Sequence, residues 1–214
     1  MSERTRVGVL VSGAGTNLEA LLRACADPEY PAQVAVVISN RTAAPALEMA
    51  RVWEVPAFAM PVGDYGGDIA ARDSAMLGTL RAAHIELVVC AGYDRLLSEQ
   101  VLRAYPEAII NVHPSLLPAF AGGMNAVRQA LDHGVKVTGC TVQLLEPGEA
   151  DGGPIILQAA VTVRDDDDVD SLLARIHHEE WRLLTEAVAL WATHRLQRDG
   201  RHIRVVPAQA VAHR

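Results

Sequence analysis

Residues 7–20 read VGVLVSGAGTNLEA: an unbroken apolar run, a turn with two glycines, and the start of a segment with helical periodicity. A strand that is buried on both faces of a parallel sheet has such an unbroken run, because neither of its faces meets water. Residues 34–38 (VAVVI) and 87–90 (LVVC) repeat the pattern. Since helical segments separate these runs, the sequence predicts an α/β fold with a doubly wound, mostly parallel sheet.

The remaining elements continue this alternation until the C-terminal half. The periodicities predict strands at residues 7–11, 34–38, 57–60, 87–90, 108–112, 138–145, 155–163 and 203–206, and helices at 17–25, 46–53, 69–83, 99–104, 126–133 and 169–191. No helix is expected between the strands at 138–145 and 155–163, so this pair indicates an antiparallel addition. Without a linker or a repeat, we expect one domain over residues 1–206 and a tail at 207–214 that frays.

Composition and charge argue against several classes of protein. The chain has 214 residues and a net charge of −7 without a basic tract, so nucleic acid is not a favoured partner. The N-terminus lacks the pattern of a signal peptide, and no apolar stretch is long enough to cross a membrane. The three cysteines are widely spaced, which indicates a reducing compartment. We therefore expect a cytoplasmic protein.

The turn at residues 12–17, SGAGTN, is a candidate anion site. Gly13 and Gly15 allow a tight turn and a close approach of the backbone to a ligand, while Thr16 and Asn17 add side-chain donors. The N–H groups at the start of the following helix favour an anion, most simply a phosphate. A plain strand-to-helix turn is the alternative. A dinucleotide is less favoured, because Leu18 occupies the third position of the G-x-G-x-x-G fingerprint.

Ligands of open α/β sheets bind outside the carboxyl ends of the strands, where residues 12–17, 91–97 and 111–118 are expected. In the last of these segments, Asn111 and His113 point to the same side of a strand, and Pro114 ends the strand directly after them. An amide donor beside an imidazole can stabilise a developing oxyanion. The alternative is that both side chains only satisfy loop carbonyls, but their position at the sheet edge favours a functional role.

Two carboxylates are candidates to complete this site. Asp151 precedes Gly-Gly-Pro, which is common turn chemistry, but a carboxylate near His113 would favour the charged imidazole and could accept a proton through water. Glu180 falls on the apolar face of the helix at 169–191, where an unpaired carboxylate is rare. It either reaches the rim of the core or binds a cation or a hydroxyl.

No metal site is expected. His177 and His178 are adjacent and cannot both face one metal from a helix, and the sequence has no H-E-x-x-H or C-x-x-C pattern. The acidic run at 165–168 is expected to be a solvated loop that ends in a helix cap.

Five motifs, taken together and in this order, resemble the phosphoribosylglycinamide formyltransferases of the folate-dependent formyltransferase family. They are SGAGTNLEA, AGYDRLLS, NVHPSLLPAF, GVKVTGCTV and DGGPIILQ, and the similarity runs from about residue 6 to residue 195. The resemblance implies a Rossmann-like formyltransferase fold, with a nucleotide-binding half at about 1–100 and a folate-binding and catalytic half at about 101–206. It implies formyl transfer from 10-formyltetrahydrofolate, as co-substrate, to the amine of glycinamide ribonucleotide in purine biosynthesis. Whether the chain acts as a monomer or a homodimer stays open.

The functional positions of the family map onto this sequence motif by motif. The resemblance implies that the catalytic set is Asn111, His113 and Asp151. It implies that the ribonucleotide site comprises Gly13, Gly15, Thr16, Asn17, Pro114 and Glu180, and the folate site Tyr93, Arg95, Leu96 and Leu97.

Several positions depart from the family pattern. Asp94 stands where the family has an apolar residue, Asn125 and Gln143 stand where histidine is common, and Trp181 replaces another histidine. Gln143 can still hydrogen-bond to Asp151, but it cannot carry a charge. These departures concern the rate and the affinity for folate more than the class of reaction.

Other functions stay open at this point. Within the family, a formyltetrahydrofolate hydrolase would be expected to add an N-terminal regulatory domain, and a methionyl-tRNA formyltransferase a C-terminal domain. A nucleotide- or folate-binding protein that has lost catalysis is the alternative from another class. Serine hydrolysis is weaker, because Ser115 lacks the G-x-S-x-G nucleophile elbow.

Overall fold

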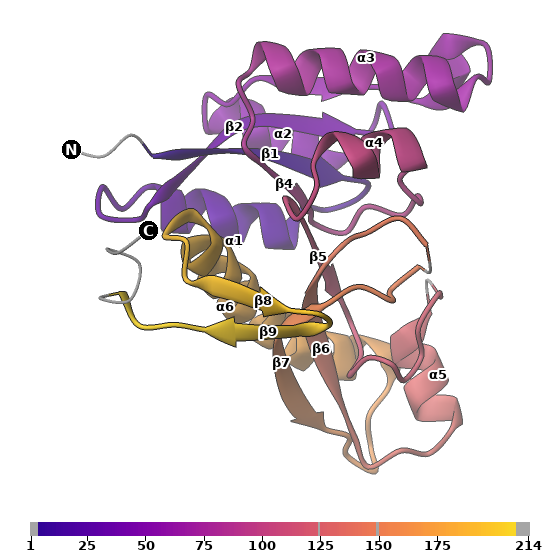
Figure 1. Ribbon diagram of the computed structural model, residues 1–214. Helices are drawn as coiled ribbons and strands as arrows, with labels where there is room; N and C mark the ends of the chain where they lie inside the picture. Colours follow the sequence, from indigo (N-terminus) through magenta and orange to yellow (C-terminus); the bar gives the residue numbers. More distant parts are fainter. Residues whose placement is uncertain (1–3, 124, 149, 209–214) are drawn as a thin grey trace. The chain divides into compact units, whose positions relative to one another are not determined.

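The computed structural model describes residues 4–123, 125–148 and 150–208, and it divides into two compact units, Met1–Ile110 and Asn111–Arg214 (Figure 1). The expectation of one domain over residues 1–206 stays a prediction. Residues 209–214 of the expected tail lie outside the described residues.

The first unit contains a parallel sheet with the strand order β3-β2-β1-β4. Its strands are β1 (Thr5–Val11), β2 (Ala32–Ser39), β3 (Ala57–Ala59) and β4 (Leu87–Cys90). Its helices are α1 (Thr16–Cys25), α2 (Pro45–Val52), α3 (Ile69–Ala82) and α4 (Glu99–Ala104), with a 3₁₀ turn, η1 (Val62–Tyr65), that the periodicity does not predict. In Figure 1, α1 and α3 lie on opposite sides of β1, as expected for a doubly wound sheet.

The core of the first unit consists of the apolar runs that the sequence contains. Val9, Leu10 and Val11 of β1 have no exposed surface. Gly8 marks the place where α3 packs closely against β1, because a Cβ there would lie 2.7 Å from Leu80 Cδ2. β1 is thus buried on both faces, which explains its unbroken apolar run. β5 (Ile109–His113) starts beside β4, where Val88 N–H donates to the Ala108 carbonyl at 2.9 Å.

The second unit pairs most of its strands antiparallel. β6 (Val137–Leu144) pairs with β7 (Ile155–Thr162), and β8 (Leu196–Asp199) pairs with β9 (His202–Val205), which also meets β7 in parallel. The predicted antiparallel addition is therefore confirmed. Gly139 allows the β6–β7 approach, because a Cβ there would lie 1.9 Å from the Ala159 carbonyl oxygen. β8 was not predicted, because the sequence LQRD is short, polar and mostly exposed.

The helices of the second unit are α5 (Ala126–Asp132) and α6 (Val169–Ala192), and α6 packs against β6 and β7. A capping box starts α6: Asp168 Oδ1 accepts from Ser171 N–H at 2.8 Å, and Ser171 Oγ accepts from Asp168 N–H at 3.0 Å. The expected cap at the end of the acidic run is thus confirmed. The helices of both units, the parallel strands of the first and the antiparallel strands of the second confirm the predicted α/β class. Among the described helices, none is long and apolar enough to cross a membrane.

Candidate active site

The glycine turn after β1 presents the start of α1 to an anion. Gly15 has a left-handed backbone (φ 85°), and a Cβ there would lie 2.7 Å from the Cβ of Ala46, so only glycine fits. A Cβ at Gly13 would meet no described atom within 4 Å, which leaves room for a ligand. No side chain in the described part of the chain caps α1, which begins at Thr16, so its first N–H groups can serve an anion. Asn17, next in the turn, is buried.

The segment after β4 lies against this turn. Ser12 N–H donates to the Gly92 carbonyl at 3.1 Å, and Asp94 N–H donates to Ser12 Oγ at 2.9 Å. Two of the three segments expected at the carboxyl ends of the strands therefore meet within the first unit. That the third, residues 111–118, joins the same site stays a prediction.

The four predicted folate residues offer apolar and cationic surface. Arg95 and Leu96 are exposed, with Leu96 at 79%, while Tyr93 and Leu97 are half-buried. The Tyr93 hydroxyl accepts a hydrogen bond from Arg72 Nη1 at 2.6 Å. Burial raises the pKa of Tyr93, so this hydroxyl stays neutral at ordinary pH. Tyr93 is therefore held in place by its polar end.

Arg72 belongs to a buried ion pair that the sequence analysis missed. Arg72 and Asp73 are 4% and 0% exposed, and Arg72 Nε lies 2.6 Å from Asp73 Oδ1. A signal was available, because Asp73 stands at helical spacing from Met76 and Leu80 on the apolar face of α3. The same signal singled out Glu180 in the second unit.

β5 ends in the predicted amide and imidazole. His113 is buried, and Asn111 and Pro114 are half-buried. The side chain of Asn111 makes no hydrogen bond to any residue that the structure describes. Its amide is therefore available to a substrate.

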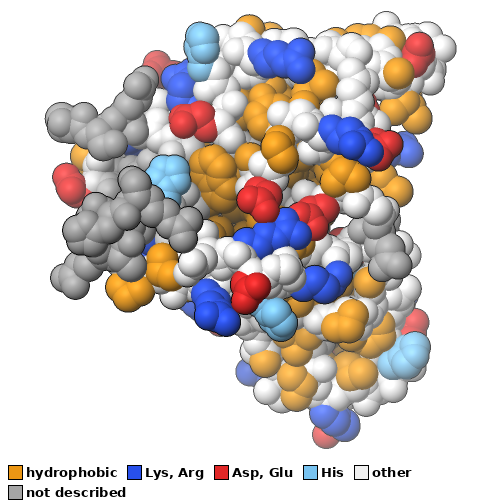
Figure 2. Space-filling model, in the orientation of Figure 1, with side chains coloured by type: hydrophobic (Ala, Val, Ile, Leu, Met, Phe, Trp, Pro, Cys, Tyr) orange, Lys and Arg blue, Asp and Glu red, His pale blue; other side chains and the backbone are white. Residues whose placement is uncertain are grey.

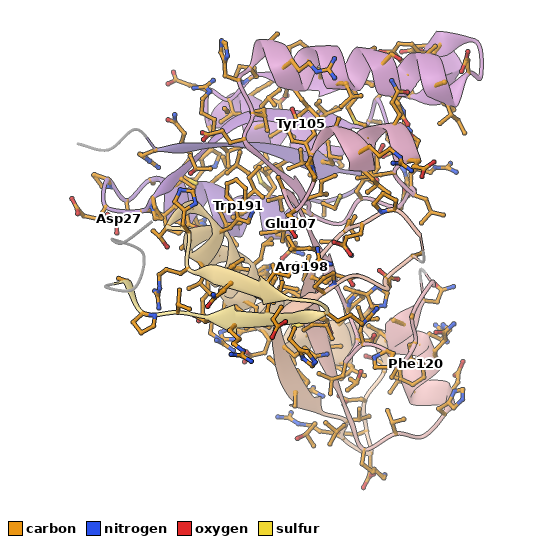
Figure 3. The ribbon with its side chains drawn as sticks, viewed as in Figure 1. Asp27, Tyr105, Glu107, Phe120, Trp191 and Arg198 are labelled. Atoms are coloured by element: carbon orange, nitrogen blue, oxygen red, sulfur yellow. The ribbon has the colours of Figure 1, made fainter. Side chains whose placement is uncertain are left out.

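Both ring nitrogens of His113 face oxygen atoms. Nε2 lies 3.1 Å from the carbonyl oxygen of Phe120, which is labelled in Figure 3, and Nδ1 lies 3.4 Å from Asp151 Oδ2. Because a carbonyl oxygen only accepts, Nε2 carries a proton. The ring is thus held between a backbone carbonyl and a carboxylate.

Asp151 is held by two further donors. Its Oδ1 accepts from Gln143 Nε2 at 3.0 Å, and its Oδ2 accepts from the backbone N–H of Gly122 at 2.9 Å. The prediction that Gln143 can hydrogen-bond to Asp151 is thus confirmed, and Gln143 itself is fully buried. Asp151 also has a left-handed backbone (φ 56°), a conformation that is uncommon outside glycine and that clusters at functional sites.

Two other chemistries find no support in the described residues. Ser115 is fully buried, and its Oγ donates to the Ala119 carbonyl at 2.6 Å, so it cannot serve as an exposed nucleophile. No group of three or more His, Cys, Asp and Glu side chains lies together as a metal site would require, within the ranges that the structure describes.

Glu180 lies inside the second unit. It is 3% exposed, and its Oε2 lies 3.9 Å from Nε2 of His177. Burial, and then the charge of Glu180, raises the pKa of the Cys140 thiol on β6 to about 12. Glu180 therefore faces β6 and does not reach solvent at the rim, which removes one of its two predicted environments.

The chain is similar to known proteins along most of its length. Residues 5–188 match the family model described as formyl transferase. The phosphoribosylglycinamide formyltransferase of Mycobacterium tuberculosis (strain ATCC 25618 / H37Rv) is 42% identical over 200 residues, which cover 94% of this chain and 91% of that protein. The crystal structure of glycinamide ribonucleotide transformylase 1 from Symbiobacterium toebii has a TM-score of 0.92 at 48% identity, and the match covers 97% of this chain and 96% of that one.

A further relative is much longer than this chain. The trifunctional purine biosynthetic protein adenosine-3 of Drosophila melanogaster is 39% identical over 189 residues, which are 87% of this chain but 14% of that protein. The family model nevertheless spans most of the chain, and the single-function relative is matched along nearly its whole length. The chain therefore belongs to the formyl transferase family.

Proposed function

We propose that this chain is a phosphoribosylglycinamide formyltransferase, which transfers the formyl group of 10-formyltetrahydrofolate to the amine of glycinamide ribonucleotide in de novo purine biosynthesis. The observation that carries the proposal is His113, held between the Phe120 carbonyl and the Asp151 carboxylate with the Asn111 amide on the same strand. The names of the Mycobacterium tuberculosis and Symbiobacterium toebii proteins support it.

Each substrate has a matching group of residues. The phosphate of the ribonucleotide suits the N–H groups at the start of α1, and its proposed site in the first unit comprises Gly13, Gly15, Thr16 and Asn17. Pro114 and Glu180 of the second unit stay predictions for the same substrate. The folate suits the apolar and cationic segment after β4, and its proposed site comprises Tyr93, Arg95, Leu96 and Leu97. The guanidinium of Arg95 can pair with a folate carboxylate.

The reaction is a direct transfer. The amine nitrogen attacks the formyl carbon, and the C=O π electrons move to the formyl oxygen. The His113 imidazolium and the Asn111 amide donate to that oxyanion, and each such donor is worth about a hundredfold in rate or more. Collapse of the intermediate re-forms the carbonyl and expels N10 of tetrahydrofolate with its electron pair. The proton lost by the amine passes through water to Asp151 and on to N10.

The length of the His113–Asp151 contact suits this role. Nδ1 and Oδ2 are 3.4 Å apart, whereas a charge-assisted hydrogen bond of this kind is about 2.7–2.9 Å. The Nδ1–H is therefore not fully committed to the carboxylate and can be shared with the formyl oxygen. Asp151 faces the ring and accepts the proton of the amine, so one carboxylate serves both positioning and proton transfer. The proposed mechanism uses no metal and no covalent enzyme intermediate.

An absorbance assay for the folate product tests the proposal, with glycinamide ribonucleotide supplied or withheld. We expect product only when the amine is present, and a loss of at least about a hundredfold for His113→Ala. His178→Ala, an exposed position on α6, is the matched control and keeps its activity. Full turnover of His113→Ala would reject the assignment. Product without the amine would identify a hydrolase instead, and binding without turnover would identify a non-catalytic binder.

We place the reaction in the cytoplasm and expect small molecules as its partners. The free cysteines Cys25, Cys90 and Cys140 suit a reducing compartment. On the face shown in Figure 2, Lys and Arg side chains alternate with Asp and Glu, and the net charge is −7, which does not favour nucleic acid. The active form is a monomer or a homodimer, which light scattering distinguishes.

A further inference from the structure

Three loops of the first unit are joined by a closed circuit of hydrogen bonds. Asp94 N–H donates to Ser12 Oγ at 2.9 Å, Ser12 Oγ donates to Asn40 Oδ1 at 2.6 Å, and Asn40 Nδ2 donates to Asp94 Oδ1 at 2.8 Å. Each of these residues follows the carboxyl end of a strand, and the strands β2, β1 and β4 are neighbours in the sheet (Figure 1). We name this set the Ser12–Asn40–Asp94 circuit.

The circuit fixes the direction of every donor in it. Asp94 Oδ1 can only accept, so the NH₂ group of Asn40 must face it, and the Asn40 carbonyl must face Ser12. The Ser12 hydroxyl then donates to Asn40 and accepts from the Asp94 backbone. Ser12 is 4% exposed, so water cannot readily replace these bonds. Removing one member therefore breaks the arrangement of the other two.

The second oxygen of Asp94 is also engaged. Arg41, the residue after Asn40, forms an ion pair with Asp94 Oδ2, and the Asp94 side chain is 11% exposed. Burial by itself would raise the pKa of Asp94, but the bonds from Asn40 and Ser12 and the charge of Arg41 outweigh it and lower the pKa below its ordinary value. Both oxygens of the carboxylate thus face protein donors. Asp94 therefore acts as a positioning residue that ties its own segment to the loops at Ser12 and Asn40.

The circuit lies between the two substrate segments. Ser12 directly precedes Gly13 of the proposed phosphate turn, and Asp94 lies within the proposed folate segment, residues 93–97. The backbone bond from Ser12 N–H to the Gly92 carbonyl, at 3.1 Å, adds a second link between them. Because these bonds link the two segments, a substrate that changes the conformation of the turn also changes that of the segment after β4, and the reverse.

We infer that the Ser12–Asn40–Asp94 circuit couples the two substrate sites, so that each bound substrate raises the affinity for the other. This inference rests on the proposed roles of residues 12–17 and 93–97. Coupling of two binding equilibria is reciprocal, and its typical size is about 5- to 150-fold in affinity. We expect the lower part of this range here, about fivefold or more, because the segments share only a few bonds.

The test measures binding without turnover. Calorimetry gives the Kd of glycinamide ribonucleotide alone and with saturating tetrahydrofolate, which lacks the formyl group and cannot react. In the wild type, tetrahydrofolate lowers this Kd by about fivefold or more. Ser12→Ala removes two bonds of the circuit and Asp94→Met removes a third, and in both variants the ratio of the two Kd values falls below that of the wild type, although the backbone bond to Gly92 remains.

A matched variant separates the circuit from the ion pair. Arg41→Met removes the charged partner of Asp94 at a side chain that is 59% exposed, and it leaves the three circuit bonds in place. It therefore keeps the wild-type ratio. Circular dichroism tests whether Asp94→Met folds. If it does not, Ser12→Ala decides the question alone, since it deletes a single oxygen.

The outcomes are distinct. A wild-type ratio close to one, or a wild-type ratio retained in Ser12→Ala, would overturn the coupling and leave the proposed function standing. If the ratio of the two Kd values falls in Arg41→Met as far as it does in Asp94→Met, the role of the circuit is overturned, because charge alone would then explain the effect. Failure of the wild type to bind either compound would refute the proposed function and the coupling together.

Discussion

Replacing Gln143 with leucine tests whether this side chain positions Asp151 for catalysis without adding to the stability of the fold. Gln143 is fully buried in β6, its Nε2 donates to Asp151 Oδ1 at 3.0 Å, and its Oε1 has no hydrogen-bond partner among the described residues. Losing a bond to a charged group costs about 1.5–3 kcal/mol, whereas removing an unpaired buried acceptor recovers about 1–3 kcal/mol. The two effects nearly cancel, so the free energy of unfolding should change by less than about 1 kcal/mol. Asp151 loses a partner, however, and kcat should fall about tenfold or more, which corresponds to about 1.4 kcal/mol.

Formyl transfer at saturating substrate, together with urea unfolding, measures both quantities on the same protein. Gln129→Leu, at an exposed position of α5, is the control and should change neither. A kcat of Gln143→Leu equal to that of the wild type would refute the positioning role. A loss of activity that is proportional to the loss of folded protein would refute the positioning role as well.

Three further changes have expected outcomes. Gly15→Ala puts a Cβ 2.7 Å from that of Ala46 at a left-handed backbone, so it should destabilise the fold by at least about 1–2 kcal/mol, seen in calorimetry as a lower Tm. An unchanged Tm would contradict the geometry. Arg72→Met leaves Asp73 buried without its cation and should cost about 3–5 kcal/mol in urea unfolding. The double variant Arg72→Met/Asp73→Leu should recover most of this, and a double variant as unstable as the single one would argue against a charge effect. Burial lowers the pKa of His177 below its ordinary value of 6.5 in the folded chain, so the unfolded chain binds its proton more readily. Its contribution is therefore complete above about pH 6.5 and is lost as the pH falls through the folded pKa. His177→Gln should flatten this part of the stability profile, and an unchanged slope would reject the argument.

The long elements could be predicted because burial leaves a periodic pattern in the sequence. β1 has an unbroken apolar run since both of its faces are covered, and α6 shows its buried face at helical spacing. η1 and β8 could not be predicted in this way. Each is four residues long, too short for a period to show, and most of the side chains of β8 are exposed.

The candidate site was predictable to the extent that it lies in motifs. His113 and Asp151 stand in two motifs, and the structure brings them to 3.4 Å. The Ser12–Asn40–Asp94 circuit could not be predicted, because its members are 28, 54 and 82 positions apart and none of them is unusual on its own. Only the folded sheet, which places β2, β1 and β4 side by side, shows that they meet.

The surroundings of the His113 ring depend on backbone conformation as well as on residue identity. The two oxygens that face its ring belong to Phe120 and Asp151, which both have a left-handed backbone, with φ of 57° and 56°. Such a conformation costs about 1–3 kcal/mol at each non-glycine residue, so the surrounding contacts must hold it. Gly122 N–H bonds to Asp151, and the ring of Phe120 packs edge-on against His133 with centroids 5.5 Å apart. A sequence motif specifies side chains but not φ angles. The position of the Phe120 carbonyl, which faces Nε2, could therefore not be read from the motif. The contacts that hold the His113 ring therefore depend on the backbone conformation at Phe120 and Asp151.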